Sequence, residues 1–475
     1  MGIVHRVTGT SKRLLKKGLR MMFAGSGSIA RASVPEHWGL TGGTSAGLAL
    51  DGIPLHTLGE EFGFPVHIVN AARLRDNARR FLAVPHGHDT GCEVFYSYKT
   101  NPVPGVLREL HAQGLGAEVI SHYELWLALQ LGVAPAKIVF NGPAKSDAAL
   151  QMAIAAGIQL LNFNHREEIA VVSRIAASLQ RKPRVGLRVT VGGGWAGQFG
   201  VPVEGGRALA AFEEALASPH LDVVGLHAHR GGMIRSEGEL TQFVDAVLAF
   251  TEQLYQRCGL SLEVLNFGGS LAAPTVHALS TRDVRLNRAF HRDLPPANPA
   301  DALAIDRYVA TIVQLVDEFH RARGRRPPRI FIEPGRAVTA DAQMLLASVI
   351  AVKEEGEGSF AILNAGINLA ESCRSEYHQI FSVNRAMLPA EKIYTVVGPI
   401  CTPGDTLYWA VRLPRLVPGD SVVIMDAGAY FVPFSTAFSF PRPPVVMVDD
   451  GGARVMRRGE TFDDLVDYDR VVPAP

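Results

Sequence analysis

The residues KIVFNGPAKSDAALQMAIAAGIQLLNF (137–163) contain the unit on which the fold prediction rests. It begins and ends with short β-rich runs, KIVFNG (137–142) and QLLNF (159–163). Between them, SDAALQMAIAAG carries apolar residues three and four positions apart, which is the spacing of an amphipathic helix. A strand, a helix and a second strand in this order indicate a parallel βαβ unit.

The same alternation extends in both directions and gives eight β-rich runs. Most are separated by stretches with helical spacing, such as HREEIAVVSRIAASLQ (165–180). Eight parallel strands with outer helices predict a (β/α)8 TIM barrel. The runs are EVFYSYK (93–99), AEVIS (117–121), KIVFNG (137–142), QLLNF (159–163), VGLRV (185–189), VVGLHAH (223–229), EVLNFGG (263–269) and RIFIEPG (329–335).

The pattern changes after residue 340, where short strand-like runs such as VVIMDAGAY (422–430) are broken by Gly, Pro and Asp. This sequence pattern predicts a separate β domain. The polar, proline-containing residues 275–300 are expected to form a long loop at the mouth of the barrel. The predicted division is therefore a basic extension (1–35), a lead-in whose strand joins the β domain (36–70), the barrel (71–340) and a C-terminal β domain (341–475).

Composition excludes several functional classes. The 475 residues are enough for two or three domains, and 47 basic against 46 acidic side chains give a net charge of +1. No overall field therefore attracts nucleic acid or an acidic membrane surface. The four cysteines are far apart and form no CxxC pair, so neither a metal site nor a disulfide scaffold is expected. Without an uncharged apolar run long enough for a transmembrane helix, we expect a cytoplasmic protein that acts on a small molecule.

Residues 1–35 differ from the rest, because seven Lys and Arg side chains precede the first acidic residue, Glu36. Apolar residues interleave with these charges in SKRLLKKGLRMMF (11–23), and the linker-like AGSGS (24–28) follows. The favoured interpretation is a mobile basic extension. An amphipathic helix that touches a membrane surface or a partner, and a transit-like segment, are the alternatives.

Catalytic residues of TIM barrels lie where the strands end. Lys99 ends the first run, and a lysine there can form a Schiff base with a carbonyl group. His229 ends the sixth run, and the seventh and eighth end in GGS (268–270) and EPGR (333–336), in loops where barrels often bind phosphate. Each feature alone has an ordinary explanation, such as a surface lysine or a packed histidine. Together they match pyridoxal phosphate, which needs an amine for its aldehyde, amides and a cation for its phosphate, and a carboxylate for its ring nitrogen.

The chain resembles the fold-type III pyridoxal-phosphate decarboxylases, which include the diaminopimelate, ornithine, arginine and carboxynorspermidine decarboxylases. The resemblance covers nearly all of the sequence except the basic extension. The motifs that carry it are YSYKTNP, GLGAEVISHYEL, FNGPAKS, GLHAHRGG, NFGGS, IEPGR, GPICTPGDTL and DAGAY.

The resemblance implies a role for each matching residue. Lys99 would bind pyridoxal 5'-phosphate covalently, His229 would stack on its ring, and Glu333 would pair with the ring nitrogen. Cys401 would return a proton to the α-carbon after decarboxylation, from a loop that reaches the active site of the neighbouring subunit. A homodimer with shared active sites is therefore implied. The other cofactor contacts implied are Gly232, Gly268, Gly269, Ser270, Gly335, Arg336 and Tyr430.

Departures from the family pattern concern the substrate most. Thr402 follows the cysteine, where relatives that bind a distal ammonium carry Asp or Glu, and a hydroxyl cannot neutralise a buried cation. The spacing from Arg374 to Tyr377 is one residue shorter than in diaminopimelate decarboxylases. Ser439 replaces a frequent asparagine, Ser270 a third glycine, and Gly232 a frequent serine. The candidate substrate-binding residues are Arg336, Arg374, Tyr377, Thr402 and Tyr430.

The leading prediction is decarboxylation of a non-standard, conjugated or carrier-bound amino acid in specialised biosynthesis of the siderophore or antibiotic type. The alternatives are a diaminopimelate or basic amino-acid decarboxylase, an amino-acid racemase, and a non-catalytic decarboxylase-like protein. Cys401 in its GPxC context favours decarboxylation over racemisation. The intact Lys99, His229 and Glu333 argue against a loss of turnover.

Overall fold

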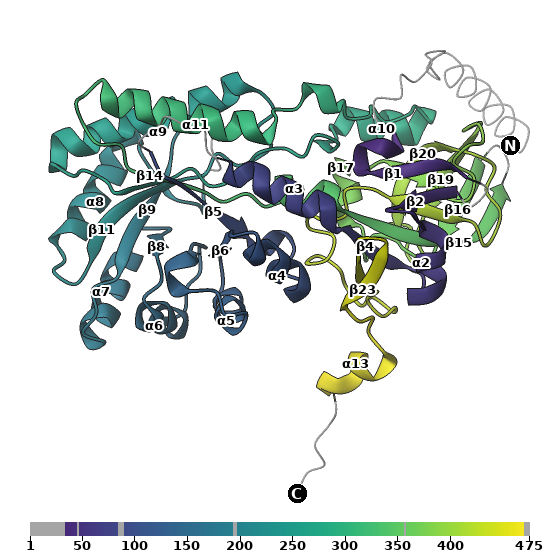
Figure 1. The fold of residues 1–475 in the computed structure, drawn as a ribbon, viewed down its shortest axis with the longest axis horizontal. Coiled ribbons are helices and arrows are strands. Elements are labelled where there is room, and N and C mark those ends of the chain that lie inside the picture. The colour runs from purple at the N-terminus through teal and green to yellow at the C-terminus, as the bar shows by residue number, and fades with distance from the viewer. Residues whose placement is uncertain (1–33, 45–46, 84–89, 193–196, 356–357, 470–475) are drawn as a thin grey trace, which may run out of the picture. The chain divides into compact units, whose positions relative to one another are not determined.

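The computed structural model describes residues 34–44, 47–83, 90–192, 197–355 and 358–469. They form two compact units (Figure 1). The barrel unit comprises residues 74–274 and 301–340, and the β unit comprises the other described residues. Residues 1–33, which include most of the expected basic extension, lie outside the described residues.

The barrel unit is built on a closed ring of eight parallel strands. Their order is β9, β11, β12, β14, β5, β6, β7 and β8, and β8 pairs with β9 to close the ring. The two-residue β10 (Val201–Pro202) pairs beside β9. The expected TIM barrel is confirmed. The strands are β5 (Cys92–Ser97), β6 (Gly116–Val119), β7 (Ile138–Phe140), β8 (Leu160–Phe163), β9 (Arg184–Thr190), β11 (Asp222–Ala228), β12 (Val264–Asn266) and β14 (Arg329–Ile332).

Helices between the strands surround the ring (Figure 1). In α6, the Ser146 hydroxyl accepts a hydrogen bond from the Ala149 amide at the N-terminus, and Gly157 in the left-handed conformation ends the helix. Leu150 and Ile154 form its buried face, as the apolar spacing predicts. The helices are α3 (Ala71–Leu82), α4 (Pro104–Ala112), α5 (His122–Gln130), α6 (Asp147–Ala156), α7 (Glu168–Ser178), α8 (Arg207–Ala217), α9 (Glu237–Cys258), α11 (Ile305–Arg321) and α12 (Arg336–Thr339).

Apolar side chains fill the barrel. Phe95 on β5 and Phe331 on β14 pack with ring centroids 4.7 Å apart. They belong to a buried cluster to which several strands contribute, namely Phe95, Val139, Leu160, Val224, Val264 and Phe331. The barrel therefore has a packed core, and a functional site has to lie at one of its ends.

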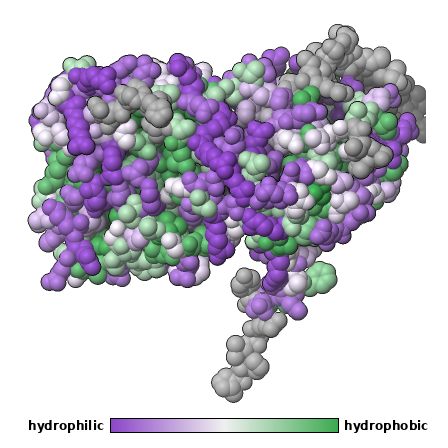
Figure 2. Space-filling view, viewed as in Figure 1, coloured by the Kyte–Doolittle hydropathy of each residue, from purple (hydrophilic) through white to green (hydrophobic). Residues whose placement is uncertain are grey.

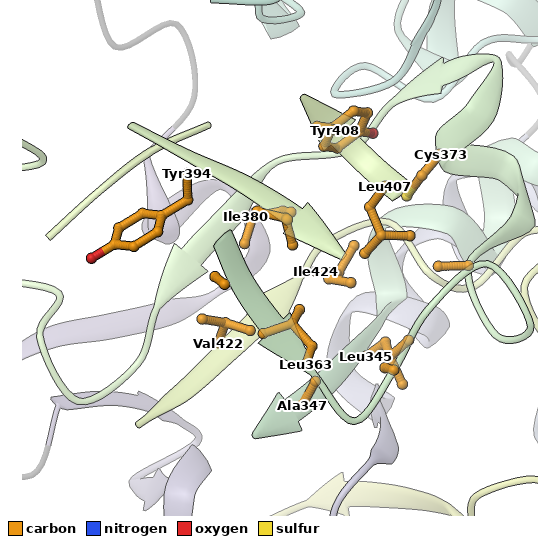
Figure 3. Packing of buried hydrophobic residues seen from close by; sticks show 14 of the residues in the cluster. Leu345, Ala347, Leu363, Cys373, Ile380, Tyr394, Leu407, Tyr408, Val422 and Ile424 are labelled. Carbon is orange, nitrogen blue, oxygen red and sulfur yellow. The ribbon is translucent and has the colours of Figure 1, made fainter. Parts of the chain in front are cut away.

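The β unit is a sheet with an apolar core on each face. In its long strand β15 (Gln343–Glu355), Leu345 and Ala347 join one buried cluster, while Met344 and Leu346 join another, as the two-residue period of a strand requires. Figure 3 shows the first cluster, where Leu363, Val422 and Ile424 lie near Leu345 and Ala347. The main path of the sheet is β20, β19, β16, β15, β4, β22 and β23, and β21 pairs with β15 and β18.

The lead-in contributes a strand to this sheet. β4 (Val66–Asn70) pairs antiparallel with β15 and parallel with β22, so the chain passes through the β unit before it enters the barrel. The other strands of the unit are β1 (Leu40–Thr44), β2 (Gly47–Leu50), β3 (Ile53–Pro54), β16 (Gly358–Leu363), β17 (Glu376–Tyr377), β18 (Ile380–Ser382), β19 (Lys392–Val397), β20 (Thr406–Leu413), β21 (Ser421–Ile424), β22 (Val445–Asp449) and β23 (Gly452–Arg457), and its helices include α2 (Leu55–Phe62) and α13 (Phe462–Val466).

The expected long loop at 275–300 is wrong. This segment contains β13 (His277–Ala278), which pairs with β17, and the helix α10 (Thr281–Phe290), and it belongs to the β unit. The helix starts at a capping box, in which Ser280 accepts from the Asp283 amide and Asp283 bonds back to the Ser280 amide. The buried Asn287 then links α10 to Trp409 and Ala410 of β20.

The surface mixes polar and apolar residues, as Figure 2 shows for one face. Among the described residues, none of the helices has the length and apolar character needed to cross a membrane.

Candidate active site

Polar side chains gather at the carboxyl ends of the barrel strands. Because all eight strands are parallel, these ends share one edge of the ring. Lys99 lies in the short 3-10 helix Tyr98–Thr100 directly after β5, and His229 lies just after β11. Glu333 follows β14, and the loop 268–270 follows β12. The predicted lysine, histidine, acid and glycine loop thus belong to the same edge.

The Lys99 amine faces a buried carboxylate. Its Nζ lies 3.4 Å from Oε2 of Glu118, which is 1% exposed on β6, and the Ser97 hydroxyl donates to the same oxygen. The Lys99 side chain is 36% exposed. The amine is therefore held by one carboxylate and remains accessible to an aldehyde.

Glu333 is buried among hydrogen-bond donors. Its Oε1 accepts from the side-chain amides of Asn141, at 2.8 Å, and Asn266. Burial and the nearby Glu118 raise the pKa of Glu333 to about 7, while the two amides and Lys99 act in the opposite direction. His227 Nε2 lies 3.5 Å from Glu333 Oε2, and burial lowers the pKa of His227 well below its usual value, so this ring is neutral.

His229 is held by the glycine loop that follows β12. The Gly269 amide donates to Nδ1 at 3.3 Å, and Nε2 lies 3.2 Å from the Ser270 hydroxyl, which also accepts from the Gly231 amide. Burial, Lys99 and Arg188 lower the pKa of His229 well below its usual value. The ring is therefore neutral near pH 7.

Close backbone approach explains the glycines of the two loops. A Cβ on Gly268 would lie 2.3 Å from His229 Nδ1, and one on Gly269 would lie 2.4 Å from the Glu333 carbonyl oxygen. A Cβ on Gly335 would lie 2.1 Å from Thr100 Oγ1, which is buried and has no hydrogen-bond partner among the described residues. Gly268 also has a φ of +62°, in the left-handed region that favours glycine. A side chain at Gly335 would therefore collide with the short helix that carries Lys99, and side chains at Gly268 and Gly269 would collide with His229 and with the backbone of Glu333.

This donor set fits pyridoxal phosphate. It offers a partly exposed amine, a buried carboxylate for the ring nitrogen, and glycine loops that place no side chain beside them, with Arg336 as an adjacent cation. The unpartnered Thr100 hydroxyl adds a donor that an anion would satisfy. Gly232, between His229 and α9, has a φ of +70° and open space where a Cβ would be.

The remaining predicted residues belong to the β unit. Cys401 is exposed on a loop that Asp405 fixes, because this buried carboxylate accepts the amides of Ile367 at 2.8 Å and Ile400 at 2.7 Å. Thr402 Oγ1 accepts the Gly404 amide at 3.3 Å, and Arg374 Nη2 lies 3.4 Å from the Gly404 carbonyl oxygen.

The tyrosines predicted for the site are already engaged in local contacts. The Tyr377 hydroxyl donates to Gln379 at 2.6 Å, and its ring stacks between those of His277 and Tyr408. Tyr430 has a φ of +70° and stacks on Phe434 with centroids 5.8 Å apart. Ser439 also has a positive φ, of 62°. The structure thus places Cys401 and Thr402 on one loop, which the Arg374 side chain reaches from the 3-10 helix Glu371–Arg374, and Tyr377 in an aromatic stack.

Several polar residues on the barrel strands, or directly after them, were not among the predicted site residues. The roles of Asn141, Asn162, Asn266, His227 and Arg188 were not predicted, although each interrupts an apolar run. A buried asparagine in KIVFN, QLLNF or VLNF needs a hydrogen-bond partner. That need is the signal that could have found them.

Comparisons with known proteins agree with this geometry. A family model described as "Pyridoxal-dependent decarboxylase, pyridoxal binding domain" matches residues 74–340. The chain is 30% identical over 431 residues to the diaminopimelate decarboxylase of Methanothermobacter thermautotrophicus, covering 88% of this chain and 94% of that one. The crystal structure of diaminopimelate decarboxylase from Methanocaldococcus jannaschii superimposes with a TM-score of 0.80 at 25% identity, covering 92% of this chain and 98% of that one. AQ1208 from Aquifex aeolicus gives a TM-score of 0.78 at 25% identity, over 93% of this chain and all of that one.

Proposed function

The chain belongs to the pyridoxal-dependent decarboxylase family and is a pyridoxal-phosphate-dependent amino-acid carboxy-lyase, and from that premise we propose that its chemistry takes place at Lys99 and Glu333. The observation that carries the proposal is one hydrogen-bonded group of side chains. It runs from the Lys99 amine through Glu118 and Asn141 to Glu333. An amine and a carboxylate at the two ends of such a group are what the cofactor requires.

When bound, pyridoxal phosphate supplies an electron sink for the electron pair left when carbon dioxide departs. Lys99 would hold the cofactor through Nζ, and Glu333 would pair with the ring nitrogen. The neutral His229 would bind the ring, and Gly268 and Gly335, which carry no side chain, would leave room for the phosphate. Together these residues would bind and orient the group, and their burial would limit the access of water.

Cys401 is the proposed proton donor that completes the reaction. Its Sγ–H would protonate the α-carbon after carbon dioxide leaves. The thiol is exposed and its loop is fixed by Asp405, so it can be presented to a second surface. In the proposed homodimer this loop serves the site of the neighbouring subunit.

Diaminopimelate is the substrate that the relatives favour. The curated relatives and the solved structure named above carry the name diaminopimelate decarboxylase, and they match nearly their whole length. This supports the alternative from the sequence over the prediction of a specialised substrate.

One observation favours a second candidate, an amino acid whose distal end is neutral or anionic. In the loop from Gly398 to Asp405, the single carboxylate is Asp405, and its two oxygens already accept backbone amides. The Thr402 hydroxyl beside Cys401 is uncharged, and Arg374 adds a cation. A substrate with a distal ammonium therefore has no free carboxylate to bind on this loop. A substrate with a distal carboxylate, or with a conjugated or carrier-bound group, could bind the Thr402 hydroxyl and the Arg374 guanidinium.

Carbon dioxide release from a panel of amino acids tests the proposal. We would compare meso-diaminopimelate, lysine, ornithine and arginine with carboxylate-bearing, conjugated and carrier-linked amino acids. A kcat/KM of about 10⁴ per molar per second or more on diaminopimelate supports the first candidate, and such a value only on the second group supports the other. The variant Thr402→Glu is the matched control, because it restores a carboxylate and should improve substrates with a distal ammonium. Exchange of the α-proton without carbon dioxide release from any of them would overturn the proposal.

A further inference from the structure

Asn141 connects the two buried carboxylates of the barrel edge. It follows β7 and is 4% exposed. Its side-chain Nδ2 donates to Glu118 Oε1 at 2.9 Å and to Glu333 Oε1 at 2.8 Å. An amide nitrogen carries two protons, so both are used, one for each carboxylate.

A second buried asparagine, Asn162, fixes the orientation of the Asn141 amide. Asn141 Oδ1 accepts from Asn162 Nδ2 at 2.8 Å. A flipped Asn141 amide would point its oxygen at two carboxylates, which no donor could compensate. Asn162 itself is 1% exposed, and a Cβ on Gly186 would lie 2.2 Å from its Oδ1, so Gly186 leaves the space in which Asn162 fits.

The electrostatic consequence concerns the charge on Glu333. Burial and the nearby Glu118 raise the pKa of Glu333, and the amide donors Asn141 and Asn266 act in the opposite direction. The charged or titratable groups that face the two acids are Lys99 after β5, Glu124 on α5, Arg188 on β9, the neutral His227 on β11 and Tyr308 on α11.

We propose that Asn141 is a positioning residue that holds Glu118 and Glu333 in fixed positions and opposes the protonation of Glu333, and so links the amine end of the cofactor site to its ring-nitrogen end. It donates one proton to each acid. Asn162 acts through Asn141, because it fixes the orientation of the Asn141 amide.

Two variants and one control test this role. Asn141→Asp keeps the shape but replaces the donor with a third acid, and Asn162→Leu removes only the group that orients Asn141. The control is Asn164→Leu, because Asn164 is also a buried asparagine beyond a barrel strand, but it bonds to Gln198 and Gly200 rather than to either acid.

The first readout is a pH titration of the visible absorbance of the protein with bound pyridoxal phosphate. No substrate is needed, so the result does not depend on which amino acid the enzyme decarboxylates. We expect the acid-side midpoint to move to higher pH by about one unit in Asn141→Asp, which is a tenfold change in protonation, and by less in Asn162→Leu. The control should keep the wild-type midpoint.

The second readout is the apo-protein, where infrared spectroscopy detects the carbonyl band of a protonated carboxyl group. Both variants should show this band at a higher pH than wild type does, and the dissociation constant for added pyridoxal phosphate should rise about tenfold in Asn141→Asp. If Asn141→Asp does not fold, as judged by circular dichroism and gel filtration, Asn162→Leu decides alone. Unchanged midpoints in a folded variant, or an equal shift in Asn164→Leu, would overturn the proposal.

Discussion

Replacing Asp405 by asparagine should release the Cys401 loop without affecting the barrel. The two carboxylate oxygens each accept one backbone amide, at 2.8 Å from Ile367 and 2.7 Å from Ile400. An asparagine keeps one acceptor and turns an NH2 group toward the other amide, so one charge-assisted bond is lost and two donors face each other. The side chain is 2% exposed, so water cannot replace the lost acceptor.

The expected cost follows from these two losses. A hydrogen bond to a charged group contributes about 1.5–3 kcal/mol, and an unsatisfied buried donor costs a similar amount, so we take about 3 kcal/mol, the lower end of their sum, as the cost. At 1.36 kcal/mol per decade, this is roughly a 100-fold change in the ratio of ordered to released loop. Gly366 and Gly398 pack directly against this carboxylate, because a Cβ on either would lie within 2.5 Å of an Asp405 oxygen.

Thiol reactivity and cofactor absorbance together check this prediction. All four cysteines are free, and Cys401 is the exposed one, so its reaction rate with a disulfide reagent reports on the loop. We expect a changed rate, a lower kcat and an unchanged visible spectrum of the bound cofactor. Asp464→Asn is the matched control, because this carboxylate also accepts a backbone amide, that of Thr461, but at an exposed helix start. If Asp405→Asn kept the wild-type rate and kcat, the account of the loop would be refuted.

Three further predictions concern the barrel and the dimer. The raised pKa of Glu333 means that the native apo-protein binds more protons than the unfolded chain between about pH 4.5 and 7. The free energy of unfolding should therefore fall as pH rises through this range. Glu333→Gln should remove this pH dependence in denaturant titrations. Gly335→Ala should weaken pyridoxal phosphate binding at least tenfold, because the new methyl group would lie 2.1 Å from Thr100 Oγ1. Equilibrium dialysis measures this affinity, and an unchanged value would show that the loop is not tightly packed. Mixed dimers of the inactive variants Lys99→Ala and Cys401→Ala should regain activity at one of two sites, whereas verified but inactive heterodimers would contradict shared sites.

Residues that are local to one strand end were predictable from the sequence. Lys99, His229 and Glu333 each close a β-rich run, so a count of runs was enough to assign them to one edge of a barrel. The glycines followed from the same reasoning, since they stand where a loop leaves a strand. Their individual roles in cofactor binding remain predictions.

Contacts between distant segments were not predictable. The amide of Asn141 meets Glu118, 23 positions earlier, and Glu333, 192 positions later, and only the register of the closed barrel brings them together. The helix α10 was missed for a different reason. Its capping signal, Ser280 with Asp283, was present, but the prolines after it suggested a loop.

Attachment of the cofactor to Lys99 can be tested by locating the covalent adduct in the chain. The purified protein with bound pyridoxal phosphate would be reduced with borohydride, digested and mapped by mass spectrometry. We expect the reduced cofactor on the peptide that contains Lys99, and no label at any lysine in Lys99→Ala. A label on another lysine in the wild-type protein, or a persistent adduct in Lys99→Ala, would contradict it.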